Sequence, residues 1–276
     1  MIELTPKIEE ALKAASNVKR RYLLMSFSGW PDAGRVASLT TEHFAKGLKA
    51  VKLLEANSSK IDVYDLTVTR PIVEIREGLI QSLILPSASL YLWKSDEQDA
   101  SITIFSGVEP SLRWKEFSDI VLRICGATSA QRIYLVGGVL DQVPHTRRPR
   151  ISAVVNMEHL KTEVKLHGLE LSNYNGPASI HSYLMLRARE YGLEAISVWG
   201  HSPTYIAQPN AIVAFHVALK LAEMMGIKVD LSELKAMAEA LKMSLNKAMA
   251  ENPDFRRLVE EIERQYDSER GPLYIS

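Results

Sequence analysis

The stretch YLVGGVLDQVPHTRRPR, residues 134–150, contains both signals that decide the fold. Its first half is a short apolar run that ends at Gly137 and Gly138, a pattern typical of a strand covered on both faces. Its second half is a loop of polar and basic side chains, and these are His145, Thr146, Arg147, Arg148 and Arg150. In α/β proteins, functional sites lie where such loops leave the carboxyl ends of strands. The stretch therefore predicts an α/β protein with a site at this loop.

On either side of this stretch, short apolar runs alternate with amphipathic segments. The predicted strands are residues 22–27, 51–55, 61–64, 90–93, 102–105, 133–136 and 195–199. The predicted helices are residues 35–48, 112–125, 157–166, 179–191 and 210–225, then one from residue 230 and one over 253–266. Such alternation indicates a layered α/β fold with a mainly parallel central sheet. We predict a core domain over residues 1–226 and a C-terminal helical appendage over residues 227–276.

Composition argues against several classes of protein. The 276 residues include 33 basic and 33 acidic side chains, and this balance argues against a nucleic-acid binder, which would show a basic face. No window approaches ~20 consecutive apolar residues, so no membrane span is expected. Cys125 is the only cysteine, which excludes a disulfide framework and is typical of the reducing cytoplasm. We expect a cytoplasmic protein without a metal site or a cofactor.

The loop after the first predicted strand, SGWPDAGR, contains Gly29 and Gly34 at the spacing of a phosphate-binding loop. The lysine and the serine or threonine of that motif are missing, and Asp32 places negative charge where a phosphate would sit. These departures argue against a Walker-type nucleotide site. Two interpretations of Asp32 stay open, because its carboxylate could cap the following helix or face a crevice shared with other loops.

A third group of loop residues surrounds the predicted strand AISVW. Gly176 followed by Pro177 predicts a helix start, whose free N–H groups can bind an anion. His201 and Tyr205 follow the carboxyl end of the strand, and His181 is predicted to be a surface or packed helix residue. This region therefore adds candidate ligand-binding groups to those of the other two loops.

If the three strands are parallel, their loops meet at one rim of the sheet. The side chains that this arrangement would bring together are Asp32, His145, Arg148 and Tyr205. Arginines there suit carboxylate or phosphate groups, and a histidine can act as an acid or a base near neutral pH. The alternative is a rigid loop whose arginines pair with acidic neighbours, which is the better interpretation of Arg147 and Arg150. For His145, Thr146 and Arg148 both interpretations stay open.

No motif assigns a reaction. The sequence has no HExxH, GxSxG, GxGxxG or CxxC, so zincin, hydrolase-elbow, dinucleotide and thiol-redox chemistry lack support, and no catalytic residue is assigned. A set such as Ser28, His145 and Asp32 can be drawn from any chain of this size and does not define a catalytic triad. The ligand-binding candidates are Gly29, Asp32, Gly34, Gly138, His145, Thr146, Arg148, Gly176, Pro177, His201 and Tyr205.

Four segments, in order along the chain, resemble those of one family: SGWPDAG, VGGVLDQVPHTRRP, YNGPASIHSYLMLRAREYGLEAISVWGHSPTYI and VDLSELKAMAE. They are similar to the prokaryotic members of the proteasome assembly chaperone family, relatives of its second subunit, over about residues 22–241. The resemblance implies a three-layer α/β/α fold like that of nucleoside phosphorylases and hydrolases, homo-oligomerisation, and in archaeal members contact with proteasome subunits. Some members are labelled as ATP-grasp proteins, but this chain has no glycine-rich lid with a lysine partner and no paired metal-binding carboxylates.

The C-terminal tail departs from one pattern of this family. Archaeal members that dock on the proteasome tend to end in a hydrophobic residue, a tyrosine and one final residue. This chain ends PLYIS, so Tyr274 lies one place too early and the terminal carboxylate of Ser276 is out of register. The tail therefore argues against docking on the proteasome.

Two functions from different classes follow. The first, implied by the resemblance, is an oligomeric chaperone-like or scaffold protein with a protein partner. The alternative is a small-ligand-binding protein or a phosphorylase-like or hydrolase-like enzyme that uses the rim of loops. The alternative predicts that Asp32→Ala and His145→Ala lose ligand binding while the fold is kept.

Overall fold

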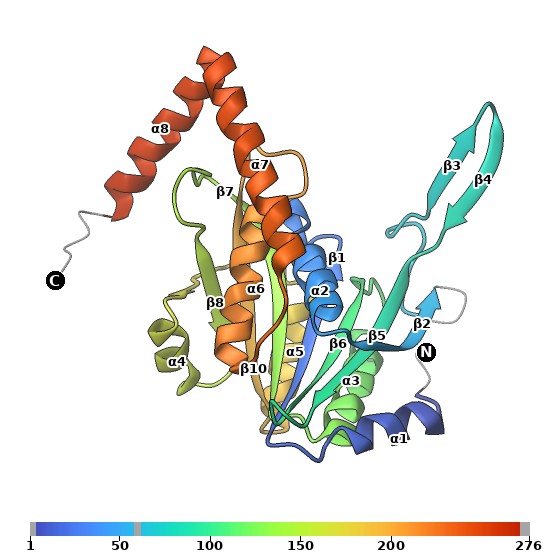
Figure 1. Cartoon of the computed structure of the whole chain (residues 1–276). Helices are drawn as coiled ribbons and strands as arrows, with labels where there is room; N and C mark the ends of the chain where they lie inside the picture. Colours follow the sequence, from blue (N-terminus) through green and yellow to red (C-terminus); the bar gives the residue numbers. More distant parts are fainter. Residues whose placement is uncertain (1–3, 58–61, 271–276) are drawn as a thin grey trace.

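The computed structural model describes residues 4–57 and 62–270 and has an eight-stranded sheet at its centre (Figure 1). Its strands are β1 (Arg20–Ser28), β2 (Val51–Asn57), β5 (Ser87–Ser95), β6 (Ala100–Val108), β7 (Arg132–Asp141), β8 (Ile151–Val155), β9 (Glu170–Leu171) and β10 (Glu194–Pro203). Their order across the sheet is β2-β5-β6-β1-β7-β10-β8-β9. The four middle strands, β6, β1, β7 and β10, are parallel to one another. Strand β5 pairs antiparallel with β6, and β8 pairs antiparallel with β10. The predicted, mainly parallel central sheet is confirmed.

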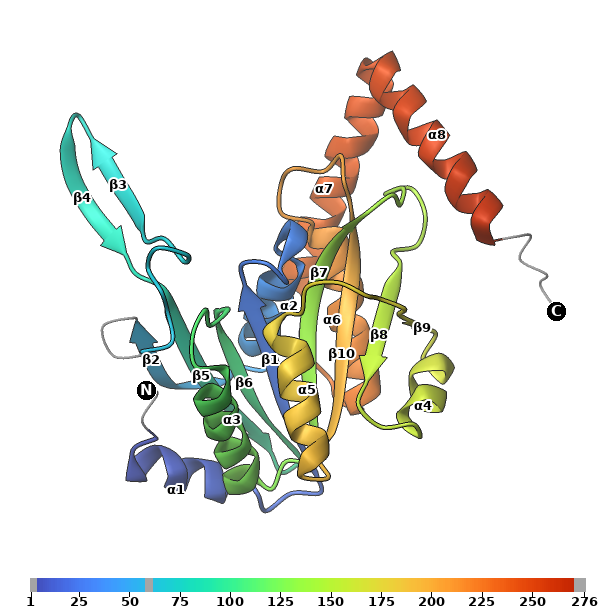
Figure 2. The same cartoon turned by 180° about the vertical axis from the view of Figure 1, so that it is seen from behind.

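Helices cover both faces of this sheet. They are α1 (Pro6–Ala14), α2 (Val36–Gly47), α3 (Trp114–Thr128), α4 (Leu160–Leu166), α5 (Ile180–Glu190), α6 (Ala211–Met225), α7 (Ser232–Glu251) and α8 (Pro253–Arg270). Helices α2, α6 and α7 lie on one face (Figure 1), and α1, α3 and α5 lie on the other (Figure 2). This arrangement is the expected three-layer α/β/α fold.

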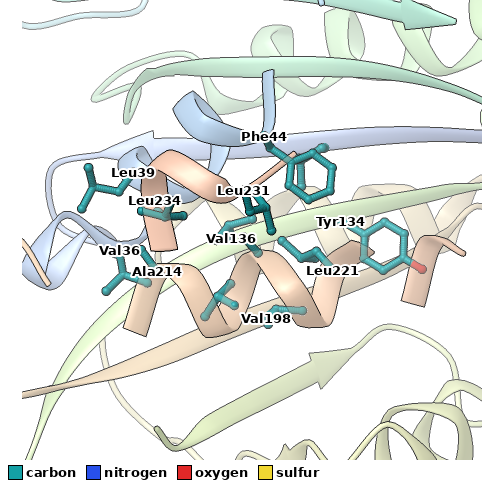
Figure 3. Close-up of a cluster of buried hydrophobic side chains, with 14 of the residues drawn as sticks. Val36, Leu39, Phe44, Tyr134, Val136, Val198, Ala214, Leu221, Leu231 and Leu234 are labelled. Atoms are coloured by element: carbon teal, nitrogen blue, oxygen red, sulfur yellow. The ribbon is translucent and has the colours of Figure 1, made fainter. Parts of the chain in front are cut away.

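Two apolar clusters join the helices to the sheet, because successive strand side chains point to opposite faces. Leu23 and Leu135 belong to the cluster under α3 and α5, whereas Tyr134 and Val136 belong to the cluster under α2 and α6. Figure 3 shows the second cluster, in which Leu221 of α6 lies beside Tyr134. All five side chains are fully buried or nearly so, and close packing of this kind holds the layers in register.

The cluster of Figure 3 also includes side chains that precede and begin α7, among them Leu231 and Leu234. The first part of the C-terminal region thus packs directly on the α/β core. The division of the chain after residue 226 stays a prediction.

Several features of the fold differ from the sequence-based expectations. Residues 62–64, the described part of the strand predicted over 61–64, are not in a strand. Helix α1, strands β8 and β9, and a two-stranded hairpin of β3 (Ile72–Arg76) and β4 (Leu79–Ile84) were not predicted. The hairpin projects from the body of the protein (Figure 1), so its apolar residues lack the buried face that produces a recognisable pattern.

Candidate functional site

The three loops predicted to form a rim do leave the same edge of the sheet, because β1, β7 and β10 are parallel. Two backbone hydrogen bonds join the loops. The N–H of Gly138 donates to the carbonyl oxygen of Pro31 at 2.8 Å, and the N–H of Asn210 donates to that of Gly34 at 2.7 Å. The loops therefore meet, and His145 lies close to Tyr205 and lines one hollow with Arg148, whereas Asp32 lines a different one.

Asp32 forms hydrogen bonds with the first turn of the helix that follows it, α2. Its carboxylate accepts hydrogen bonds from the backbone N–H of Ser38, at 3.1 Å, and from the Ser38 hydroxyl. Burial raises the pKa of Asp32 above its usual value, although these hydrogen bonds oppose the effect. Asp32, Gly29 and Arg35 line a wide hollow of about 810 Å³ beside α2. The geometry supports the capping interpretation of Asp32.

His145 lies under the C-terminal helix α8. The Tyr205 hydroxyl accepts a hydrogen bond from the His145 backbone N–H and lies 2.7 Å from His145 Nδ1. The His145 ring stacks on Phe255 of α8, with the ring centroids 6.4 Å apart. Burial lowers the pKa of His145 and raises that of Tyr205 to about 12. These two predicted site residues are thus brought together, but by packing against α8.

The neighbouring side chains hold the same helix. Thr146 donates to the Glu263 carboxylate, and Arg147 donates to Glu263 at 3.1 Å and to Asp267 at 2.8 Å. Arg148 is exposed and, together with His145, Thr146 and Arg147, lines a hollow of about 320 Å³ between this loop, α6 and α7. The basic loop therefore binds α8 through several of its side chains. Arg147 pairs with acidic neighbours there, as the sequence analysis expects.

Gly176 and Pro177 do not begin a helix directly. Helix α5 starts at Ile180, after the N-cap residue Ser179, and the Ile180 N–H donates to the carboxylate of Glu109 at 2.8 Å. The predicted anion position at this helix start is therefore occupied by a side chain of the protein itself. Pro177 instead lines a cavity next to α5.

That cavity has a volume of about 240 Å³ and lies over β8 and β10. Ser152 and Val154 of β8 and Ser197, Trp199 and His201 of β10 contribute to its lining. Trp199 pairs with Ser152 in the sheet, and alternation along β10 places Ser197, Trp199 and His201 on one face. Helix α5 and residues 172–179 supply further walls.

His201, one of the predicted candidates, connects this cavity to an acidic side chain. Its Nε2 atom lies 2.8 Å from Ser152 Oγ, and its Nδ1 atom lies 2.7 Å from Asp141 Oδ2. The hydrogen bond to His201 lowers the pKa of Asp141. Arg150 donates to the same Asp141 oxygen at 3.0 Å. Ser152, His201 and Asp141 thus form a linear hydrogen-bonded series that opens into the cavity.

Sequence reasoning missed Ser152 and Asp141 as site residues. Ser152 lies in a strand that was not predicted, and Asp141 is the last residue of β7, eleven positions before it. No local spacing distinguishes such a pair, because a Ser–His–carboxylate series is recognised by geometry and not by sequence position. The one available signal was the position of His201 after a predicted strand.

His181 of α5 lies at the same cavity and is fully buried. Its Nδ1 atom is 3.0 Å from Ser197 Oγ, and its Nε2 atom has no hydrogen-bond partner among the described residues. Burial lowers the pKa of His181 to about 3. The imidazole is therefore neutral at physiological pH.

The free energy of unfolding is expected to fall as pH falls below about 6.5, because the unfolded chain protonates His181 there and the native state does not. One such group gives a slope of up to about 1.4 kcal/mol per pH unit between the unfolded and folded pKa values. Urea unfolding at pH 7.5, 6.5, 5.5 and 4.5 measures it. His181→Gln should give a shallower slope than wild type, whereas His216→Gln should not. Parallel curves for wild type and His181→Gln would contradict the assignment.

No group of three or more metal-ligating side chains from His, Cys, Asp and Glu occurs within the described residues. Cys125 is buried, and burial raises the pKa of its thiol to about 12, so it packs as a small apolar residue.

The fold and the strand-end loops define a three-layer α/β/α protein with a helical C-terminal region seated on one loop. The model of the PAC2 family matches residues 26–249, and the chain belongs to this family. No curated protein matches the chain at a significant level.

Solved structures agree with this membership. A PAC2 family protein from Streptomyces avermitilis is 26% identical, with a TM-score of 0.72 over 82% of this chain and 95% of that one. The proteasome-assembly chaperone homologue of Mycobacterium tuberculosis is 25% identical, with a TM-score of 0.74 over 86% and 99%. PbaB of Pyrococcus furiosus, an archaeal proteasome activator, is 21% identical, with a TM-score of 0.63 over 84% and 94%, and shares the fold.

Proposed function

We propose that this chain is an oligomeric, chaperone-like assembly protein whose copies associate through the hairpin of β3 and β4, here called the apolar arm (residues 72–84). Membership of the PAC2 family and the likeness to a proteasome-assembly chaperone homologue support the functional class. The single observation that carries the proposal is the exposure of large hydrophobic side chains along this arm.

The apolar arm exposes large hydrophobic side chains on an element that is marginal by itself. Those side chains, each between 46% and 67% exposed, are Ile72, Val73, Ile75, Leu79, Ile80, Leu83 and Ile84. An isolated two-stranded hairpin is at best marginally stable in water. No further strand of the described residues pairs with β3 or β4. A contiguous apolar surface of this kind marks a protein contact.

A second copy of this chain is the partner that fits the arm. Its two outer strand edges are unpaired within the described part of the chain, and an unpaired edge is a template for another strand. Antiparallel edges are self-complementary about a two-fold axis, the commonest symmetry of soluble oligomers. The only charges within β3 and β4 are Glu74 and Arg76, which pair with each other at 2.6 Å, and Glu77 lies in the turn at the tip, so the strands of two arms can approach without repulsion between them.

The experiment is sedimentation equilibrium of the purified chain with an arm variant, Ile75→Lys with Ile80→Lys, whose residues are cross-strand partners. Wild type is expected as a dimer or larger at micromolar concentration and the variant as a monomer with an unchanged circular dichroism spectrum. Leu166→Lys, which replaces an 84% exposed leucine on α4, is the control and should stay oligomeric. A monomeric wild type, or an oligomeric arm variant, would refute the proposal.

Two further points belong to this proposal. No helix within the described residues is long and apolar enough to cross a membrane. A cytoplasmic location is part of the proposal. Tyr274 and Ser276, on which the sequence-based expectation about proteasome docking depends, lie outside the described residues.

A further inference from the structure

We propose that Ser152, His201 and Asp141 form a nucleophilic serine site that hydrolyses a small, uncharged carboxylic ester, with the acyl group held in the cavity over β8 and β10. This activity is independent of the apolar arm.

The hydrogen bonds run in the direction that nucleophilic catalysis requires. The Ser172 hydroxyl donates to Ser152 Oγ at 3.0 Å, which leaves the Ser152 proton for His201 Nε2, 2.8 Å away. His201 Nδ1–H then donates to Asp141 Oδ2 at 2.7 Å. Each ring nitrogen faces the partner that a general base needs: the hydroxyl on Nε2 and the carboxylate on Nδ1. In this series the His201 ring has its hydrogen on Nδ1, so Nε2 can accept the proton of Ser152.

Asp141 is a positioning residue in this series. Arg150 Nη1 binds the same Asp141 oxygen at 3.0 Å, and the backbone N–H of Gln142 donates to the other oxygen at 2.8 Å. These contacts hold the carboxylate in one orientation, and the carboxylate in turn holds the imidazole. His201 itself has only 12% of its side chain exposed, so the ring is also confined by packing.

The cavity favours a small uncharged group. None of its lining residues is Asp, Glu, Lys or Arg, and Trp30, Val154, Met185 and Trp199 provide apolar walls. Burial of a charge without a partner is costly, so a charged acyl group would be disfavoured. A volume of about 240 Å³ is at the small end of ligand sites and suits a short acyl chain.

His181 supplies a hydrogen-bond donor that the protein itself leaves without a partner. Ser197 Oγ lies at Nδ1 of His181, 3.0 Å away, and a serine hydroxyl that donates there leaves the ring hydrogen on Nε2. That N–H is buried and has no acceptor among the described residues, although other atoms of His181 line the cavity. The protein encloses the Nε2 atom, so a carbonyl oxygen of a bound ester can accept from it only when the ring turns toward the cavity, and such a bond would remove the cost of a buried unpaired donor.

The reaction is ordinary ester hydrolysis with water as co-reactant. Ser152 Oγ forms a bond to the carbonyl carbon while its proton passes to His201 Nε2. The bond from that carbon to the leaving oxygen then breaks, and the alcohol departs with the proton from His201. Water adds to the acyl–Ser152 ester, gives a proton to His201 and releases the carboxylic acid, and His201 returns a proton to Ser152.

The test uses the full chain and a small alkyl fluorophosphonate, which phosphonylates activated serines, followed by intact mass and peptide sequencing. Wild type is expected to gain one adduct, on Ser152, and to hydrolyse p-nitrophenyl acetate to acetate and p-nitrophenol. Ser152→Ala and His201→Gln should lose about 100-fold or more of both rates, since loss of a triad member removes the activated nucleophile. Ser268→Ala and His216→Gln, matched replacements away from the cavity, should react as wild type.

Asp141→Asn distinguishes positioning from folding. It is expected to slow labelling and to change the dependence of the labelling rate on pH, while the melting temperature stays close to that of Ser152→Ala. An unlabelled wild type, an adduct at another serine, or a folded Ser152→Ala variant that reacts like wild type would overturn the proposal.

Discussion

Replacing Leu221 by alanine is expected to lower the free energy of unfolding by about 3 kcal/mol, since truncation of a buried leucine loses its transfer free energy and leaves a cavity. Leu221 of α6 is fully buried, and Figure 3 shows it between the helix layer and Tyr134 of β7. The core there contains side chains from several elements, among them α2, α6, α7, β7 and β10, so it cannot collapse easily into the space. Urea unfolding followed by circular dichroism measures the effect.

Leu166→Ala is the matched control for that substitution. Both leucines lie in helices, so alanine suits both positions, but Leu166 at the end of α4 is 84% exposed. Its replacement should change the unfolding free energy by no more than about 0.5 kcal/mol. Equal effects of the two substitutions would mean that the layer of α6 is not packed on the sheet as described.

Gly138→Ala is expected to destabilise the protein by about 2 kcal/mol, because an added methyl group would overlap the loop that crosses the end of β7. A Cβ atom at Gly138 would lie 2.4 Å from the carbonyl oxygen of Ala33 and 3.0 Å from Val36 Cβ. The loop can make room only by losing the hydrogen bond from the Gly138 N–H to Pro31. Thermal and urea unfolding report the loss.

Gly126→Ala should not destabilise the protein. Gly126 lies inside α3, and a Cβ atom there meets nothing within 4 Å. Alanine favours a helix by up to about 1 kcal/mol relative to glycine, so this variant should be as stable as wild type or more stable. If Gly138→Ala were equally harmless, the close approach of the loop to β7 would be contradicted.

Much of the fold could be predicted from local pattern. Runs such as YLLMSF and AISVW are apolar throughout because they are buried on both faces, and they became β1 and β10 with boundaries extended by a few residues. Two of the elements that were missed, β8 and the apolar arm, have no such burial signal. In the arm the hydrophobic residues face solvent in the single chain, so no buried face marks them in the sequence.

The candidate residues show the limit of this reasoning more clearly. His145 and Thr146 were chosen for their chemistry, but α8, which starts more than one hundred positions later, packs on His145 and accepts a hydrogen bond from Thr146. Asp32 was assigned two interpretations, and the choice between them depends on its contact with Ser38. A side chain's neighbours decide whether its charge is free to bind a ligand, and neighbours distant in sequence are not visible in a local pattern.

The sequence by itself determined the order of strands and helices, the parallel centre of the sheet and the PAC2 resemblance, because these follow from periodicity, loop length and motifs along the chain. Only the tertiary structure decided where the polar groups meet. The antiparallel pairing of β8 with β10 brings Ser152 to His201, and the end of β7 brings Asp141 to the other side of the ring. The loop that first indicated a site, VPHTRRPR, also holds α8, because Thr146 and Arg147 bind acidic side chains of that helix, and ligand binding at this loop stays a prediction.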